Sequence, residues 1–132
     1  MGGGIILDGK VFEGAHAGGA ELGHTSLICG GEPCTCGRKG CVEAYVSATA
    51  LIRDAKRAAQ QYPESSLNAM CEGDLSHMNG KIPFDAAQDG DTAAEKVVND
   101  YICYLGETIT NLSIFPPDIV LLSGGICNQG KN

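Results

Sequence analysis

The chain has 132 residues, a formal net charge of −7, 19 glycines and 7 cysteines. Its length suits one compact domain, and its nine scattered Lys and Arg residues do not form the basic stripe that a nucleic-acid-binding protein needs. No apolar run approaches the roughly 20 residues that span a bilayer, and the first residues do not resemble a secretory signal. We therefore expect a cytoplasmic protein with no nucleic-acid or membrane partner.

The N-terminal segment predicts a β-hairpin. Residues 2–7 are typical of a strand, and Asp8-Gly9 supplies the two-residue turn favoured in tight hairpins, because both positions tolerate a positive φ. Residues 11–13 would form the returning strand. From residue 14 to residue 40 the chain is rich in glycine and polar residues without a helical or strand period, so we expect a structured loop there.

Two helices are predicted further along the chain. Apolar residues at three- and four-residue spacings predict the first helix, from near Val42 to just before Pro63. The second begins at a cap, Asp91 or Thr92, and ends before two consecutive prolines at 116 and 117. The residues expected on the buried faces are Leu51, Ala55, Ala58 and Tyr62 in the first helix, and Ala94, Val97, Val98, Tyr101, Leu105, Ile109 and Leu112 in the second.

The rest of the chain indicates an α/β domain. Residues 65–89 are irregular, with short helices expected after Ser66 and Pro83, and the apolar run 119–122 predicts a short buried strand. Strands with helices between them are typical of α/β domains. The first strand has no lead-in and the chain stops just after a strand-to-glycine turn. We therefore expect a single domain, residues 1–132, that belongs to a longer protein and is truncated at both ends.

Three cysteines within eight residues, Cys34, Cys36 and Cys41, predict a metal site. An odd number of cysteines without an export signal argues against a disulfide framework. Zinc prefers four soft or borderline ligands, and four protein ligands would make the ion structural. We expect His24 as the fourth ligand, with Cys29 as the alternative; the competing interpretation is a set of ordinary buried thiols. The cysteines expected to be buried apolar groups are Cys71, Cys103 and Cys127.

Two glutamates accompany the predicted metal ligands. Glu21 lies three residues before His24, and Glu43 lies two residues after Cys41. Carboxylates brought to such a place could accept hydrogen bonds from sugar hydroxyls, and the ring nitrogen of His24 that does not face the metal could contact a ligand as well. On spacing alone, solvated loop charges are an equally good interpretation.

Four segments of the chain, together with the hairpin at Asp8-Gly9, also carry a family resemblance. The segments are Gly14-Ala15-His16-Ala17-Gly18-Gly19, Glu21-Leu22-Gly23-His24, Cys34-x-Cys36-Gly37-x-x-Gly40-Cys41-x-Glu43 and Leu122-Ser123-Gly124-Gly125-Ile126. Together they resemble the ROK family (repressor, open reading frame, kinase), and within it the chain is most like the bacterial glucokinases. The cysteine segment is the most specific of the four.

The resemblance implies a two-domain actin-like, ribonuclease-H-like fold that transfers the γ-phosphate of ATP to a sugar hydroxyl. This chain would then be part of the larger C-terminal domain, with a zinc-binding loop. The residues implied to bind zinc are His24, Cys34, Cys36 and Cys41, and those implied to contact the sugar are Glu21, His24 and Glu43. The glycines implied to lie near the nucleotide are Gly2, Gly3, Gly4, Gly124 and Gly125.

The chain departs from the family at two places. Ala20 stands where family members usually have glycine, so the loop must differ here if that position requires a positive φ. The family's catalytic base is an aspartate in an Asn-Asp-Ala-type segment that precedes the glycine-rich strand. No aspartate of this chain has that context, so we expect the base to lie in an N-terminal domain outside the chain.

The expected function is that of an ATP- and Mg-dependent kinase acting on the 6-hydroxyl of glucose or a related hexose. The full-length enzyme would be a homodimer with a structural zinc, and this chain alone would be inactive. The alternative is the effector-binding portion of a sugar-responsive transcriptional repressor of the same family. A third interpretation is an unrelated zinc-stabilised binding module.

Overall fold

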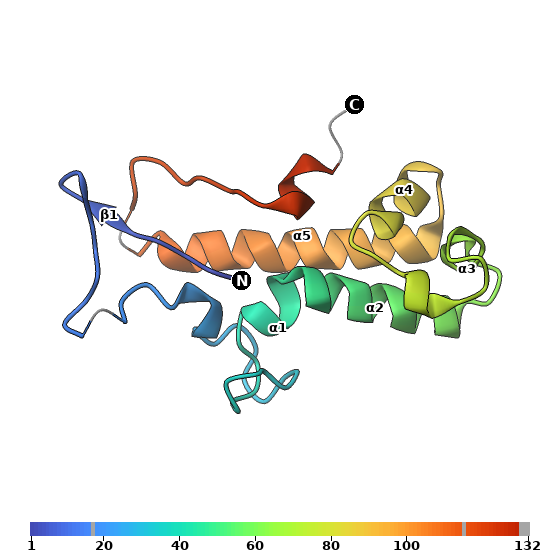
Figure 1. The fold of residues 1–132 in the computed structure, drawn as a ribbon, viewed down its shortest axis with the longest axis horizontal. Helices are drawn as coiled ribbons and strands as arrows, with labels where there is room; N and C mark the ends of the chain where they lie inside the picture. Colours follow the sequence, from blue (N-terminus) through green and yellow to red (C-terminus); the bar gives the residue numbers. More distant parts are fainter. Residues whose placement is uncertain (17, 115, 130–132) are drawn as a thin grey trace. The chain divides into compact units, whose positions relative to one another are not determined.

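The computed structural model describes residues 1–16, 18–114 and 116–129 (Figure 1). Within them the chain divides into two compact units, residues 1–47 and residues 48–132, which we describe separately. Ala17, which belongs to the glycine-rich segment of the family resemblance, lies outside the described residues. The expectation of one domain in a longer protein stays a prediction.

The first unit begins with the predicted hairpin, which is shorter than expected. Strand β1 (Ile6–Leu7) pairs antiparallel with β2 (Lys10–Val11). The turn residues Asp8 and Gly9 have φ values of 52° and 72°, and a two-residue hairpin turn of type I′ requires a positive φ at both positions. Its apolar side chains are largely exposed, so the turn rather than a buried face determines this element.

The predicted structured loop contains one turn of 3-10 helix, η1 (Leu22–His24), and leads to a short helix, α1 (Glu43–Val46). The expected single helix from Val42 is wrong, because the backbone becomes extended at Ser47, where ψ is 159°. A new helix begins at the next residue, in the second unit. Nothing in the apolar spacing marks this break, since the spacing continues across it.

The second unit is helical. It contains α2 (Ala48–Gln61), α3 (Ser66–Met70), η2 (Leu75–His77), α4 (Ile82–Gln88), α5 (Thr92–Leu112) and η3 (Gly125–Asn128). The short helices predicted after Ser66 and Pro83 are thereby confirmed as α3 and α4. Figure 1 shows α5 running alongside α2, and α5 packs against both α2 and α4.

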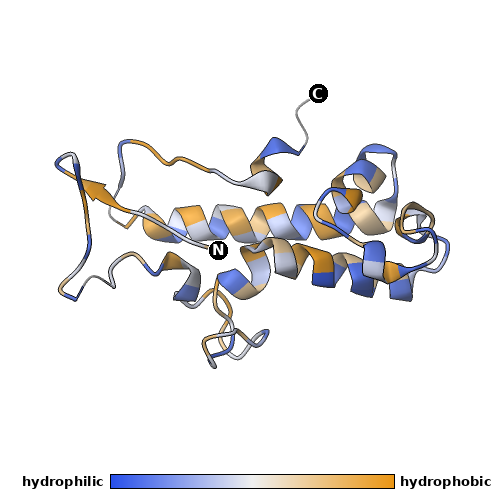
Figure 2. Cartoon of the chain, in the orientation of Figure 1, coloured by the Kyte–Doolittle hydropathy of each residue, from blue (hydrophilic) through white to orange (hydrophobic). Residues whose placement is uncertain are grey.

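The core of this unit follows the predicted helix faces in part. Apolar and polar residues alternate along α2 and α5, as the hydropathy colours of Figure 2 show. On α2, Tyr62 was expected to be buried but is 39% exposed, because the helix ends at Gln61 and its stripe ends with it. On α5, the stripe becomes half-exposed towards the C-terminus, at Leu105, Ile109 and Leu112. The residues confirmed as buried are Leu51, Ala55, Ala58, Ala94, Val97, Val98 and Tyr101.

Asp91 is the N-cap of α5 and connects it to the start of α3. One carboxylate oxygen accepts a hydrogen bond from the backbone N–H of Ala94 at 2.9 Å. The other accepts from the hydroxyl of Ser65 at 2.8 Å, and from the N–H and hydroxyl of Ser66 at 2.6 and 3.0 Å. Burial would raise the pKa of Asp91, but these hydrogen bonds together lower it.

The apolar run 119–122 is not a strand in the structure. It has no regular secondary structure and pairs with no strand among the described residues, and Leu121 is 86% exposed. A strand needs a hydrogen-bonded neighbour, and the single described sheet is the two-stranded hairpin of the first unit. The described chain is therefore mainly α-helical, and the expected α/β alternation does not appear within it.

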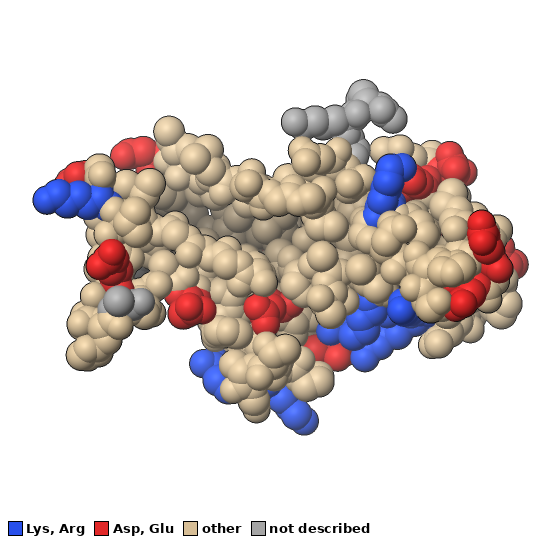
Figure 3. All heavy atoms as spheres, in the orientation of Figure 1, with Lys and Arg blue, Asp and Glu red and all other residues tan. Residues whose placement is uncertain are grey.

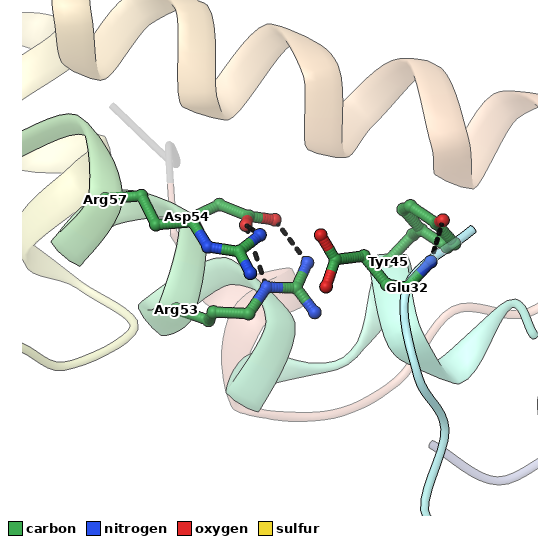
Figure 4. A network of polar contacts seen from close by, with 5 residues as sticks. All are labelled: Glu32, Tyr45, Arg53, Asp54 and Arg57. Atoms are coloured by element: carbon green, nitrogen blue, oxygen red, sulfur yellow. Dashed lines mark hydrogen bonds and ion pairs between the residues drawn. The ribbon is translucent and has the colours of Figure 1, made fainter. Parts of the chain in front are cut away.

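The surface carries mixed charges. On the face shown in Figure 3, basic side chains form separate groups and not one continuous surface. The charge of one such group on α2 is partly offset, because Asp54 accepts two hydrogen bonds from Arg53 and a longer one from Arg57 (Figure 4). No helix in the described part of the chain is long and apolar enough to cross a membrane.

Candidate metal centre

Residues 25–42 fold back on themselves through backbone hydrogen bonds centred on Gly40. Its carbonyl accepts from the N–H groups of Leu27 and Ile28 at 2.7 and 3.1 Å, and its N–H donates to the carbonyl of Glu32 at 2.8 Å. The N–H of Glu32 in turn donates to the hydroxyl of Tyr45, a buried residue of α1, at 2.6 Å (Figure 4). The loop is therefore held by hydrogen bonds that do not depend on a metal.

Two glycines allow the sharp return between the cysteines. Gly37 closes a turn by donating its N–H to the carbonyl of Cys34 at 3.0 Å, with a φ of 87°. Gly40 has a φ of 80°, and a Cβ there would overlap the carbonyl oxygen of Ile28. The two glycines thereby allow the chain to bring Cys41 back towards Cys34 and Cys36.

The loop gathers four potential metal ligands. One ligand atom from each of His24, Cys34, Cys36 and Cys41 lies within 4.8 Å of all the others. The Sγ of Cys34 lies 3.5 Å from Nδ1 of His24, and the Sγ atoms of Cys36 and Cys41 are 3.7 Å apart. The alternative fourth ligand, Cys29, is exposed and is not among these four.

These separations fit a tetrahedral zinc ion. Zinc–sulfur bonds of about 2.3 Å and zinc–nitrogen bonds of about 2.0 Å place two sulfurs about 3.8 Å apart, and a sulfur and a nitrogen about 3.5 Å apart. The two measured pairs, at 3.7 and 3.5 Å, already have this spacing. Movements of about 1 Å would bring the remaining pairs to it. The donor set of three thiols and one imidazole also matches a common structural zinc site.

The buried and the exposed thiols of the cluster differ in pKa. Cys41 is completely buried, and this burial together with the Cys36 and Cys34 thiols raises the pKa of Cys41 to about 11. Cys36 is exposed, and the backbone N–H of Arg38 lowers the pKa of its thiol. Without a cation the buried thiol holds its proton at neutral pH. A divalent cation would displace that proton, because thiolates and not thiols are the ligands.

Glu43 lies beside this cluster. Its Oε1 accepts a hydrogen bond from the hydroxyl of Thr35 at 2.9 Å and lies 3.9 Å from the Sγ of Cys34. Its Oε2 accepts from the amino group of Met1 at 3.1 Å. These hydrogen bonds, first that from Met1 and then that from Thr35, lower the pKa of Glu43. The carboxylate therefore stays ionised, and it is an acceptor for hydrogen bonds.

Glu21 is placed differently. Its side chain is exposed, and among the described residues no hydrogen bond or ion pair joins its carboxylate to the cluster. Its backbone is nevertheless tied to the metal ligands, since its carbonyl accepts from the N–H of His24 at 3.0 Å. Ala20, just before it, has a φ of 64°, so the chain keeps a positive φ here with alanine in place of glycine. Its carbonyl accepts from the N–H of Leu22 at 2.8 Å, which closes a tight turn around Glu21.

The glycines expected near a nucleotide belong to both units. Gly2, Gly3 and Gly4 are exposed and extended before the hairpin in the first unit. In the second unit, Gly124 has a φ of 124° and Gly125 begins η3. A Cβ on Gly2, Gly4, Gly124 or Gly125 would meet no atom within 4 Å, so packing inside the chain does not explain these glycines. Their predicted role at a nucleotide stays a prediction.

The residue that the sequence did not single out is Thr35. It lies between two of the predicted ligands and was treated only as the variable position of the cysteine motif. Its hydroxyl contact with Glu43 spans eight residues, and no spacing rule for helices or strands applies within an irregular loop.

Comparison with known proteins identifies a family and several relatives of the chain. The family model described as "ROK family" matches residues 1–132. A glucokinase of Thermotoga maritima is 36% identical over 132 residues, which are 99% of this chain and 41% of that protein. The chain thus spans about two fifths of the length of this relative.

Two solved structures are also similar. A ROK family glucokinase from Streptomyces griseus in complex with glucose and AMPPNP has a TM-score of 0.78 and 34% identity, covering 86% of this chain and 37% of that one. A ROK family transcriptional regulator, a homologue of the E. coli Mlc protein, has a TM-score of 0.77 and 32% identity, covering 96% of this chain and 31% of that one.

Proposed function

Because the chain belongs to the ROK family, we propose that it forms the zinc- and sugar-binding part of an ATP-dependent kinase that phosphorylates glucose, or a related hexose, at the 6-hydroxyl. The observation that carries the proposal is the ionised Glu43 carboxylate, hydrogen-bonded to the loop that gathers His24 and the three cysteines. The likeness to glucokinases, one of them in complex with glucose and AMPPNP, supports the reaction and the substrate class.

Zinc would be bound by Nδ1 of His24 and by the sulfurs of Cys34, Cys36 and Cys41. With all four positions filled by protein atoms, the ion would act as a cross-link and not as a Lewis acid for the substrate. The cross-link would fix Cys41, and with it the start of α1, against residues 34–36. It would also leave Nε2 of His24 as the ring nitrogen available to a ligand.

The sugar would be recognised by hydroxyl hydrogen bonds. Glu43 would accept from hydroxyls, because a carboxylate offers about four lone-pair positions and the described hydrogen bonds occupy only part of them. His24 would contact a hydroxyl through Nε2. Glu21 is exposed and linked to His24 through its backbone, so it would supply a second carboxylate from the other side of the metal ligand.

ATP and Mg would be used by the full-length enzyme, with Gly2, Gly3, Gly4, Gly124 and Gly125 near the nucleotide. Phosphoryl transfer depends mainly on positioning and on charge neutralisation. The aspartate that deprotonates the 6-hydroxyl would come from outside this chain. We therefore propose that the 132-residue chain alone does not phosphorylate glucose. We also propose that the full-length protein is a cytoplasmic homodimer that acts in carbohydrate metabolism.

A second candidate function is that of a sugar-responsive repressor. The likeness to the transcriptional regulator, with a TM-score of 0.77, favours it nearly as strongly as the likeness to the glucokinase. Both functions would use the same zinc loop and the same sugar contacts. They differ in whether the full-length protein transfers phosphate or binds an operator.

The test is a coupled assay of ATP-dependent glucose phosphorylation with the full-length, zinc-loaded protein. We expect activity in the wild type and a strong rise of KM for glucose in Glu43→Gln, which keeps the side chain's shape but removes its charge. Glucose binding without phosphorylation, together with operator binding, would favour the repressor. Absence of both glucose binding and phosphorylation in the zinc-loaded protein would contradict the proposed function.

A further inference from the structure

We propose that Thr35 is a positioning residue for hexose binding, which holds the Glu43 carboxylate in place from within the metal loop. This inference rests on the proposed role of Glu43 in sugar recognition. Thr35 lies between Cys34 and Cys36, so its backbone is fixed whenever both sulfurs are bound to one ion. Its hydroxyl donates to Oε1 of Glu43 at 2.9 Å. The metal loop and the carboxylate are thereby joined by a side-chain contact as well as by the chain.

Thr35 is the closer of two groups of the loop that face Glu43. The thiol of Cys34 lies 3.9 Å from Oε1, whereas the hydroxyl of Thr35 lies 2.9 Å from it. A hydroxyl at that distance makes a full hydrogen bond, while a thiol is a weak donor even when it is close. Thr35 is therefore the donor from the loop that keeps Oε1 in its place.

The position of Glu43 makes this contact useful. Its side chain is 23% exposed, so an outside hydroxyl can reach it. An oxygen that accepts from Thr35 still has a second lone pair for a ligand. Without that contact the carboxylate would keep only the hydrogen bond of Oε2 with the Met1 amino group, so it would lose more rotamer freedom when the sugar binds, and such a loss weakens binding. Thr35 therefore arranges the carboxylate before the sugar arrives.

The experiment compares Thr35→Val with Thr35→Ser in the full-length, zinc-loaded protein. Valine has nearly the shape of threonine but no hydroxyl, whereas serine keeps the hydroxyl. Binding of D-glucose is measured by calorimetry, zinc by elemental analysis, and KM and kcat by the coupled assay. We expect Thr35→Val to weaken glucose binding about three- to tenfold, from the cost of ordering one long side chain. Its zinc content and kcat should stay near those of the wild type, and Thr35→Ser should bind glucose like the wild type.

The Glu43→Gln variant distinguishes a failure of the positioning role of Thr35 from a failure of the proposed function. If it loses glucose affinity while Thr35→Val binds like the wild type, the positioning role is overturned and the proposed function stands. If Thr35→Val loses its zinc, Thr35 is a structural residue of the metal loop and the positioning role is again overturned. If the wild type binds no glucose, or if Glu43→Gln binds it unchanged, both the proposed role of Glu43 and this inference fall.

Discussion

Replacing Gly40 by alanine tests how the metal loop is built, because two separate penalties coincide at this position. An L-residue with a φ near 80° costs about 1–2 kcal/mol relative to glycine. The added Cβ would also overlap the carbonyl of Ile28, and displacing a packed neighbour costs about 1–3 kcal/mol. We expect Gly40→Ala to destabilise the metal-binding conformation by about 3 kcal/mol. Zinc affinity would then fall by roughly a hundredfold, since each 1.4 kcal/mol is a factor of ten.

Gly37 provides the matched control. It has a similar φ of 87°, but a Cβ there would meet no atom within 4 Å. Gly37→Ala should therefore lose only about 1–2 kcal/mol, which corresponds to roughly tenfold in affinity. Zinc affinity of both variants is measured by competition with a chromophoric chelator at neutral pH. Equal affinities of Gly40→Ala and Gly37→Ala would refute the packing of Gly40 against Ile28.

Two further predictions concern stability. Asp91→Ala should lower the free energy of unfolding by about 3 kcal/mol, because the helix cap is lost and the donors of Ser65 and Ser66 lose their acceptor. Folding lowers the pKa of Asp91, so its ionised carboxylate stabilises the folded chain. This stabilisation is complete above the pKa of the unfolded chain, about 3.9, and is lost as the pH falls through the pKa of the folded chain. We therefore expect the difference in free energy of unfolding between wild type and Asp91→Asn, measured with urea, to be larger at pH 7 than at pH 3. An equal difference at the two pH values would contradict this. Ala20→Gly should stabilise the chain by about 0.5–1 kcal/mol in thermal unfolding, because glycine adopts the positive φ of this position without strain. A loss of stability would show that the positive φ of Ala20 is not a source of strain.

The features that the sequence predicts correctly are those determined by a few neighbouring residues. Asp8-Gly9 forms the hairpin turn because both residues tolerate a positive φ. Asp91 caps α5 because a carboxylate can accept from an N–H three residues ahead. The cysteine segment closes around its glycines, and His24 lies with the three cysteines whereas Cys29 does not; that these four residues bind zinc stays a prediction. In each case the interaction lies within one turn or one loop.

The features that the sequence does not predict depend on packing or on distant partners. The helix break at Ser47 interrupts an apolar spacing that continues through it. The run 119–122 has the composition of a strand, but the described chain offers it no strand to pair with. Cys103 and Cys127, expected to be buried, are exposed, whereas Cys71 is buried as expected. The composition of a segment indicates which secondary structure and burial it favours, but its neighbours in space determine which of these it adopts.

The two glutamates proposed to contact the sugar also show which features local spacing predicts and which depend on the folded loop. Glu43 was singled out by its distance from Cys41, and the structure places it beside the cluster. Its hydrogen bond with Thr35 could not be derived from spacing, because it depends on how the loop folds back. Glu21 was chosen by its distance from His24, yet only its backbone is held near that residue in the described chain.

The central claim is that His24, Cys34, Cys36 and Cys41 form one zinc site, and elemental analysis of the purified protein tests it most directly. Cys36→Ser removes a ligand, and Cys29→Ser, which changes an exposed thiol outside the cluster, is the matched control. We expect about one zinc per chain in the wild type and in Cys29→Ser, and its loss in Cys36→Ser. A wild type without zinc, or a Cys36→Ser variant that retains zinc while Cys29→Ser loses it, would refute this zinc site.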